Sequence, residues 1–104
     1  MIESDSIKVL IHAPTPEALK RARQNALNLL RARPDAQVRI MLSGPAVSAA
    51  LESDPHESDP LTWLCPNTLA NIGEQVRAPM QVMKEAAILL VARLQQNGWA
   101  YVRA

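Results

Sequence analysis

Aromatic residues, cysteine and long apolar runs are the features that this 104-residue chain has least of. Phenylalanine is absent and aromatic residues make up 3% of the chain, so the core must be built from Ala, Leu, Ile, Val and Met. The longest wholly apolar run, residues 86–92, is much too short to cross a bilayer. The first five residues are acidic where a signal peptide would be basic. We therefore expect neither a membrane-spanning protein nor a secreted, disulfide-rich one.

The single cysteine, Cys65, excludes an intramolecular disulfide and fits a reducing cytoplasm. The 11 basic and 10 acidic residues give a net charge of +1, without the basic excess of a nonspecific nucleic-acid binder. The two histidines and the cysteine lack the spacing of a zinc site, and three isolated glycines form no phosphate loop. The sequence thus predicts a soluble cytoplasmic protein, a single domain over residues 1–104, with no nucleic acid, metal or cofactor.

Strand and helix patterns alternate along the chain. Short runs rich in apolar residues predict strands at residues 7–12, 38–42, 61–65, 80–83 and 99–102. Helical spacing of apolar residues, with Pro or Gly at the ends, predicts helices at residues 16–33, 46–51, 67–72 and 86–97. This alternation implies an α/β fold in which helices pack on a mostly parallel sheet.

The segment 52–60 contains Glu-Ser-Asp-Pro twice, with His56 between the two copies. Polar residues punctuated by proline are typical of an exposed loop. We interpret the segment as a duplication on the protein surface. A lid over a site is the alternative.

The carboxyl ends of parallel strands lie at one edge of a sheet, which is where open α/β sheets bind ligands. His12, Ser43 with Gly44, and Cys65 end three of the predicted strands, so we expect them to lie at this edge. Ser43 and Gly44 also precede a helix, and their backbone N–H groups are candidates for binding an anion. His12 is either a base for Cys65 or a strand-end histidine that is hydrogen-bonded to a backbone carbonyl.

Cys65 precedes Pro66, and because proline is favoured at the first helical position, Cys65 is the predicted N-cap of the helix at 67–72. Its sulfur would then lie over the N–H groups of Asn67 and Thr68. Those groups favour the thiolate, which is the nucleophilic form. The alternative is a small buried hydrophobe, since free cysteine is among the most buried residue types.

The predicted helix 86–97 is apolar all the way round over residues 86–92, whereas a surface helix has one apolar stripe. Such a helix is either covered within the monomer or in contact with another subunit. We expect a homo-oligomer that forms through this helix. A buried strand is the alternative for part of the run.

Four segments carry a resemblance: residues 7–33, residues 38–47, Leu-Cys-Pro-Asn-Thr-Leu at 64–69, and Leu-Gln-Gln-Asn-Gly-Trp-Ala-Tyr-Val at 94–102. In this order and spacing they resemble the DsrE/DsrF-like family with the YchN-like fold, over nearly the whole chain. The resemblance implies a three-layer α/β/α sandwich of five strands, with the last strand beside the first, and an oligomeric state. For characterised members it implies a sulfur relay through a cysteine persulfide. Only Cys65 matches a cysteine of the family pattern, as in the small single-cysteine members, and the doubled segment is not part of that pattern.

The sequence therefore leaves one leading hypothesis and two alternatives. In the leading hypothesis, Cys65 accepts sulfane sulfur from a donor protein as a persulfide and passes it to an acceptor thiol, while the N–H groups of Asn67 and Thr68 stabilise the sulfur anion. The first alternative is a non-catalytic oligomeric binding module, with an inert Cys65 and a small anion or partner at the strand edge. The second is a redox sensor that forms an intersubunit disulfide through Cys65.

Overall fold

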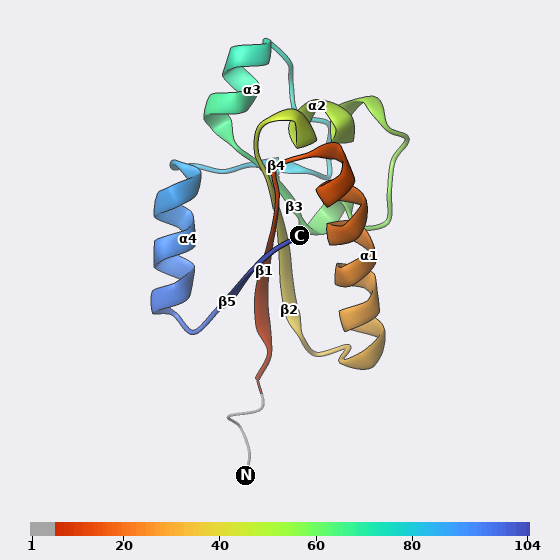
Figure 1. The fold of residues 1–104 in the computed structure, drawn as a ribbon, viewed down its shortest axis with the longest axis vertical. Helices are drawn as coiled ribbons and strands as arrows, with labels where there is room; N and C mark the ends of the chain where they lie inside the picture. The colour runs from red at the N-terminus through yellow and green to blue at the C-terminus, as the bar shows by residue number, and fades with distance from the viewer. Residues whose placement is uncertain (1–5) are drawn as a thin grey trace.

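The computed structural model describes residues 6–104, so the acidic first five residues lie outside it. Helices and strands alternate as predicted, and every predicted boundary lies within one residue of the observed one (Figure 1). The elements are β1 (Lys8–Ala13), α1 (Pro16–Ala32), β2 (Gln37–Leu42), α2 (Pro45–Glu52), the 3-10 helix η2 (Asp59–Leu61), β3 (Thr62–Leu64), α3 (Pro66–Ile72), β4 (Gln81–Val82), α4 (Ala87–Gln96) and β5 (Ala100–Arg103).

Helix α1 shows how the local sequence determines the ends of an element. The side chain of Thr15 accepts a hydrogen bond from the backbone N–H of Ala18 at 3.1 Å, and Pro16 occupies the first turn. The helix ends at Ala32, shortly before Pro34, which cannot continue it. Its buried residues form one stripe at helical spacing: Ala18, Leu19, Ala22 and Ala26.

The five strands form one sheet in the order β4-β3-β2-β1-β5, and all neighbouring pairs are parallel. The predicted α/β class is therefore confirmed, with a sheet that is parallel throughout. The return of β5 to pair with β1 places Tyr101 opposite Leu10 and Arg103 opposite His12. The carboxyl ends of β1, β2 and β3 share one edge of the sheet, beside which α2 and α3 begin (Figure 1).

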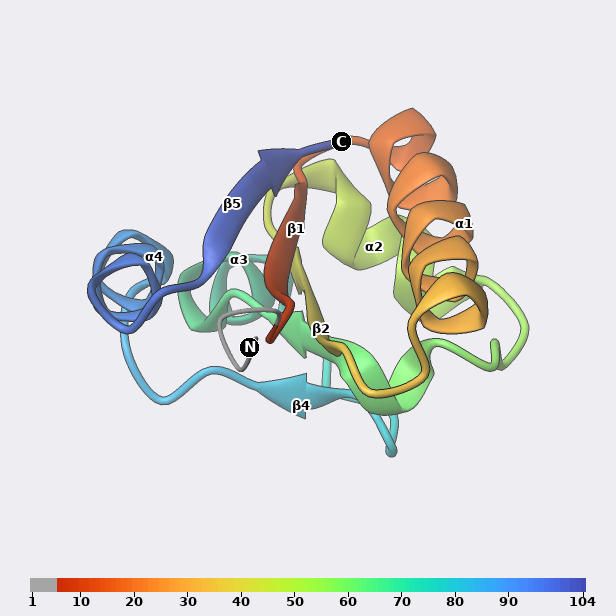
Figure 2. The same cartoon turned by 90° about the horizontal axis from the view of Figure 1, so that it is seen from below.

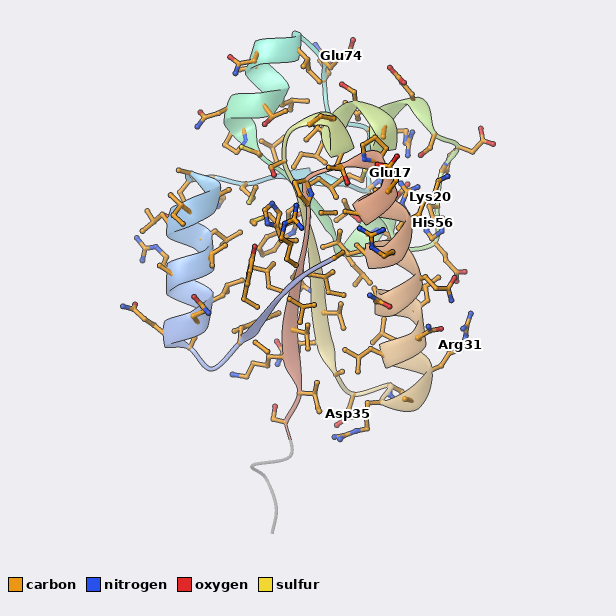
Figure 3. All side chains as sticks on the ribbon, viewed as in Figure 1. Glu17, Lys20, Arg31, Asp35, His56 and Glu74 are labelled. Atoms are coloured by element: carbon orange, nitrogen blue, oxygen red, sulfur yellow. The ribbon has the colours of Figure 1, made fainter. Side chains whose placement is uncertain are left out.

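Helices α1 and α2 cover one face of the sheet (Figure 2). The main core lies between them and the strands, and its buried strand residues are at most 2% exposed: Ile11, Ala13, Val38, Ile40, Leu42 and Leu64. The charged side chains of Glu17, Lys20 and Arg31 lie on the outer side of α1 (Figure 3). This face of the sheet is therefore a closed core beneath a solvated helical surface.

Helix α4 packs on the opposite face, over a smaller core of Leu10, Met41, Cys65 and Met83 (Figure 2). No residue of α4 is fully buried, and Ile88 is 77% exposed. All four residues of β5 are exposed as well. Complete coverage of the apolar helix within the monomer, one of the two alternatives for residues 86–97, is therefore excluded.

The doubled segment 52–60 is not an exposed loop along its whole length, which corrects the prediction. Helix α2 continues to Glu52, and η2 begins at Asp59. In the first copy Asp54 is exposed, whereas in the second copy Ser58 and Asp59 are 0% and 1% exposed. Two identical tetrapeptides thus have different environments, because only in the second is the aspartate paired with partners from elsewhere in the fold.

Those partners form what we call the Asp59 cluster, which consists of Arg23, Ser53, Asp59 and Arg77. The carboxylate of Asp59 lies 3.1 Å from Nη2 of Arg77 and 3.6 Å from Nη2 of Arg23. Arg23 also donates to Oγ of Ser53 at 3.3 Å, and Arg77 donates to the carbonyl oxygen of Ser53 at 2.8 Å. A buried carboxylate requires such partners because its desolvation is costly. The cluster therefore ties the doubled segment to α1 and to the chain after α3.

Candidate functional site

Three predicted site residues lie at the carboxyl edge of the sheet: His12 near the end of β1, Ser43 directly after β2, and Cys65 directly after β3. In the strand order β3-β2-β1, strand β2 separates His12 from Cys65. Two strand spacings amount to about 10 Å, which is too long for a hydrogen bond. His12 is therefore not placed to act as the base for Cys65.

The imidazole of His12 is hydrogen-bonded on both sides of its ring. Its Nδ1 lies 2.7 Å from Oη of Tyr101, and its Nε2 lies 2.8 Å from Oγ of Ser43. Tyr101 belongs to β5 and Ser43 follows β2, the two strands that flank β1. The predicted partners, Cys65 or a backbone carbonyl, are thus replaced by two hydroxyl groups. We call Tyr101, His12 and Ser43 the His12 chain.

All three residues of the His12 chain line a pocket of about 440 Å³ between α4 and the sheet. Gln95 of α4 adds one more polar side chain. The remaining lining is apolar and consists of Met41, Ala87, Ile88 and Val91. Sites for small molecules typically have this volume and this combination of apolar walls with a few convergent polar groups.

Burial lowers the pKa of His12 below its ordinary value of 6.5, and the positive charge of Arg103 lowers it further. Arg103 is the residue opposite His12 on β5. Both effects favour the neutral imidazole, which has one N–H donor and one acceptor nitrogen. At neutral pH His12 therefore donates to one of its two hydroxyl partners and accepts from the other.

The backbone N–H groups of Ser43 and Gly44 are already bonded within the protein. Ser43 donates to the carbonyl oxygen of Ala13 at 3.3 Å, and Gly44 donates to Oγ1 of Thr68 at 3.2 Å. Gly44 has a φ of +55°, and a Cβ there would lie 3.3 Å from the carbonyl oxygen of Pro14, so this turn requires glycine. The anion site expected at these two N–H groups is thus occupied by protein acceptors. Ser43 instead contributes its hydroxyl group.

Cys65 is the N-cap residue of α3, as predicted. Its side chain makes no capping hydrogen bond, so the expected contact of the sulfur with the N–H groups of Asn67 and Thr68 is not formed. The Asn67 side chain is exposed, and that of Thr68 bonds Gly44. Cys65 itself is 7% exposed in the small core beneath α4. These are the surroundings of a packed thiol.

Tyr101 is the site residue that the sequence analysis missed. It is the only tyrosine of the chain, and it lies on the strand that the resemblance places beside the first one. This expected neighbourhood of the last and first strands was the one sequence signal that Tyr101 lies near His12. It did not identify Tyr101 as a partner of His12, because strand order alone does not give the register that puts Tyr101 opposite Leu10.

Within residues 6–104, no three His, Cys, Asp or Glu side chains gather closely enough to hold a metal ion. Over the same residues, no helix combines the length and the apolar character needed to span a bilayer. No protein-family model matches this chain, and no curated protein matches it either. The geometry of the site is therefore the basis of the function proposed below.

Proposed function

We propose that this protein is a binding module that holds a small molecule in the pocket between α4 and the carboxyl edge of the sheet. The observation that carries the proposal is the pair of hydrogen bonds made by His12, which fix the hydroxyl groups of Ser43 and Tyr101, two residues that line a largely apolar pocket. Polar groups held in this way orient a ligand, while apolar walls remove its surface from water. In this proposal Cys65 is a packed, inert thiol.

The geometry favours binding over nucleophilic catalysis by Ser43. A nucleophilic serine needs donors positioned for the oxyanion that forms during acyl transfer. The nearest backbone donors, the N–H groups of Ser43 and Gly44, are bonded to Ala13 and Thr68 instead. The pocket thus offers fixed hydroxyl groups without an assembled oxyanion site.

A ligand screen by differential scanning fluorimetry tests the proposal, because a ligand that binds only the folded state raises the melting temperature. Compounds that stabilise the wild type should lose this effect in the Ser43→Ala/Tyr101→Phe double variant. They should keep it in Ser48→Ala, a matched control that removes a hydroxyl group from α2 outside the pocket. Compounds that stabilise all three proteins equally would refute this pocket as the binding site.

The position of Cys65 favours a second candidate function, that of a cytoplasmic sulfur carrier. Cys65 lies at the N-cap of α3, at the carboxyl edge of the sheet, with a sulfur that no capping hydrogen bond engages. Its thiolate would attack the outer sulfur of a donor persulfide, so that a new S–S bond forms on Cys65 as the donor's S–S bond breaks and the donor thiolate leaves. An acceptor thiolate would then take the sulfur from Cys65 by the same exchange. A single cysteine fits the reducing cytoplasm.

Intact-protein mass spectrometry after incubation with a sulfane-sulfur donor tests the carrier function. A carrier gains one sulfur atom that a reductant removes, and the Cys65→Ser variant gains none. Alkylation of the folded protein by iodoacetamide adds a second readout, since a thiol that serves as a nucleophile must be accessible. A cysteine that neither gains sulfur nor reacts before denaturation would refute the carrier and support the binding module.

We also propose a homo-oligomer in which α4 and β5 meet a second copy of the chain. Ile88 and Leu89 on α4 are 77% and 43% exposed, and Tyr101 and Val102 on β5 are 37% and 42% exposed. Strand β5 lies at the edge of the sheet, and proteins usually cover or charge such an edge because its free N–H and C=O groups pair readily with other chains.

Sedimentation analysis tests the oligomer. Ile88→Glu combined with Leu89→Glu should shift the protein to the monomer, whereas Lys20→Glu on the outer side of α1 should leave its size unchanged. A wild-type protein that sediments as a monomer at high concentration would refute the proposal.

A further inference from the structure

One of the two hydroxyl hydrogens in the His12 chain takes part in no hydrogen bond within the chain. Neutral His12 donates its ring N–H to one hydroxyl group and accepts the hydrogen of the other. The hydroxyl that accepts keeps its own hydrogen, and no further partner of the Ser43 or Tyr101 hydroxyl exists among the described residues. Both residues line the pocket, and in either tautomer of His12 one of their O–H groups remains to donate to a ligand. A ligand that fits must present an acceptor there.

The surroundings of this donor are electropositive. Arg103 lies opposite His12 on β5, and its charge acts on the imidazole. Helix α4 begins at Ala87, which lines the pocket, so the partial positive charge of a helix N-terminus lies beside it. The N-cap residue Ala86 has no side chain that accepts a hydrogen bond from the free N–H groups of the first turn. Among the described residues that line the pocket, none carries a carboxylate. The charges therefore favour an anionic acceptor.

The remaining walls require that this anion has an apolar body. Met41 lines the pocket from the sheet, and Ala87, Ile88 and Val91 line it from α4. An inorganic anion would leave these side chains facing water, whereas an alkyl chain would cover them. On the basis of the binding function proposed above, we infer that the pocket takes a small aliphatic monocarboxylate. Its carboxylate accepts a hydrogen bond from the His12 chain, and its alkyl chain lies along Met41 and Val91.

Isothermal titration calorimetry with hexanoate, hexanamide and hexylammonium tests this assignment, because the three probes share an alkyl chain and differ in the charge of the head group. Hydrogen bonds to a charged acceptor are stronger than those to a neutral one, so hexanoate should bind about tenfold or more tightly than hexanamide. Hexylammonium should bind most weakly, because Arg103 repels it. Ser43→Ala and Tyr101→Phe should each weaken hexanoate binding by about tenfold, while Ser48→Ala leaves it unchanged.

Equal or weaker binding of hexanoate relative to hexanamide would overturn the ligand class. So would hexanoate affinity that is unchanged in both Ser43→Ala and Tyr101→Phe. The binding function itself survives such a result if hexanamide, hexylammonium or a compound from the thermal screen binds in a way that depends on Ser43 and Tyr101. If no compound binds in a way that depends on Ser43 and Tyr101, both the ligand class and the binding function are refuted.

Discussion

Two polar clusters lie on opposite sides of the sheet, and they differ in what their side chains face. In the Asp59 cluster, a carboxylate that is 1% exposed is ion-paired with Arg23 of α1 and with Arg77. In the His12 chain, two hydroxyl groups are bonded to one imidazole, and the residues that carry them also line a pocket. The comparison separates polar groups that hold the fold together from polar groups that are held by the fold and remain available to a ligand.

The helices that cover the two faces of the sheet also differ in how deeply their apolar residues are buried. Helix α1 presents four buried residues to the sheet, whereas α4 presents none. The face under α1 and α2 is buried within the chain, whereas α4 and β5 on the other face remain partly exposed. We therefore expect mutations on the first face to affect stability and mutations on the second to affect binding and assembly.

The largest expected effect comes from Asp59→Asn, which leaves the charges of Arg23 and Arg77 without their buried partner. Breaking a buried ion pair typically costs about 3–5 kcal/mol of the free energy of unfolding. Asp54→Asn is the same change in the exposed first copy of the doubled segment, and it should cost less than about 0.5 kcal/mol. Urea unfolding followed by circular dichroism measures both. Equal costs would contradict the structural role of the Asp59 cluster.

A matched pair of leucines extends the comparison to the apolar residues. Leu19→Ala on α1 should cost about 2–5 kcal/mol, because Leu19 is 3% exposed in the main core. Leu89→Ala on α4 should cost about 1 kcal/mol or less, because Leu89 is 43% exposed. Both are measured by urea unfolding at low protein concentration. A large cost at Leu89 that does not depend on concentration would show that α4 is as firmly packed as α1.

A smaller effect on stability is expected in the His12 chain. Ser43→Ala and Tyr101→Phe each remove one hydrogen bond beside the pocket, and each should lower the free energy of unfolding by about 0.5–1.5 kcal/mol. The same unfolding experiment measures the change. A loss as large as that of Asp59→Asn would make the His12 chain a structural cluster as well.

The smallest effect is a dependence of stability on pH that originates in His12. Because burial and Arg103 lower the pKa of His12 in the folded protein, the unfolded chain takes up the proton first as the pH falls. The contribution of His12 is therefore present above pH 6.5 and decreases as the pH falls through the range between 6.5 and the lowered value. In unfolding experiments at several pH values, the His12→Gln variant should lose less of its free energy of unfolding than the wild type as the pH falls below 6.5. If the free energy of unfolding of the variant falls as steeply as that of the wild type over this pH range, the contribution assigned to His12 is contradicted.

The order of elements could be predicted from the sequence because local signals determine it. Thr15 with Pro16 begins α1, Pro66 begins α3 after its N-cap Cys65, and Gly73 ends α3 in the left-handed conformation. The gathering of His12, Ser43 and Cys65 at one edge followed from the parallel topology alone. These inferences use short-range patterns and one general rule of α/β folds.

The contacts that distinguish the two clusters could not be predicted in this way. Asp54 and Asp59 have the same local sequence, and only the positions of Arg23 and Arg77 in space decide which of them is buried. The bond between His12 and Tyr101 depends on the register of β1 with β5, which joins the two ends of the chain. Both features depend on long-range packing, about which one sequence carries no local signal.

The most direct test of the central claim is amide chemical-shift mapping by NMR, with each compound that raises the melting temperature of the wild type. If the pocket beside the His12 chain is the binding site, the largest shifts occur at Ser43, at Tyr101 and in the first turn of α4, and the Asp59 cluster is unaffected. Shifts centred on the Asp59 cluster, or on Cys65 and α3 without the His12 chain, would contradict the claim.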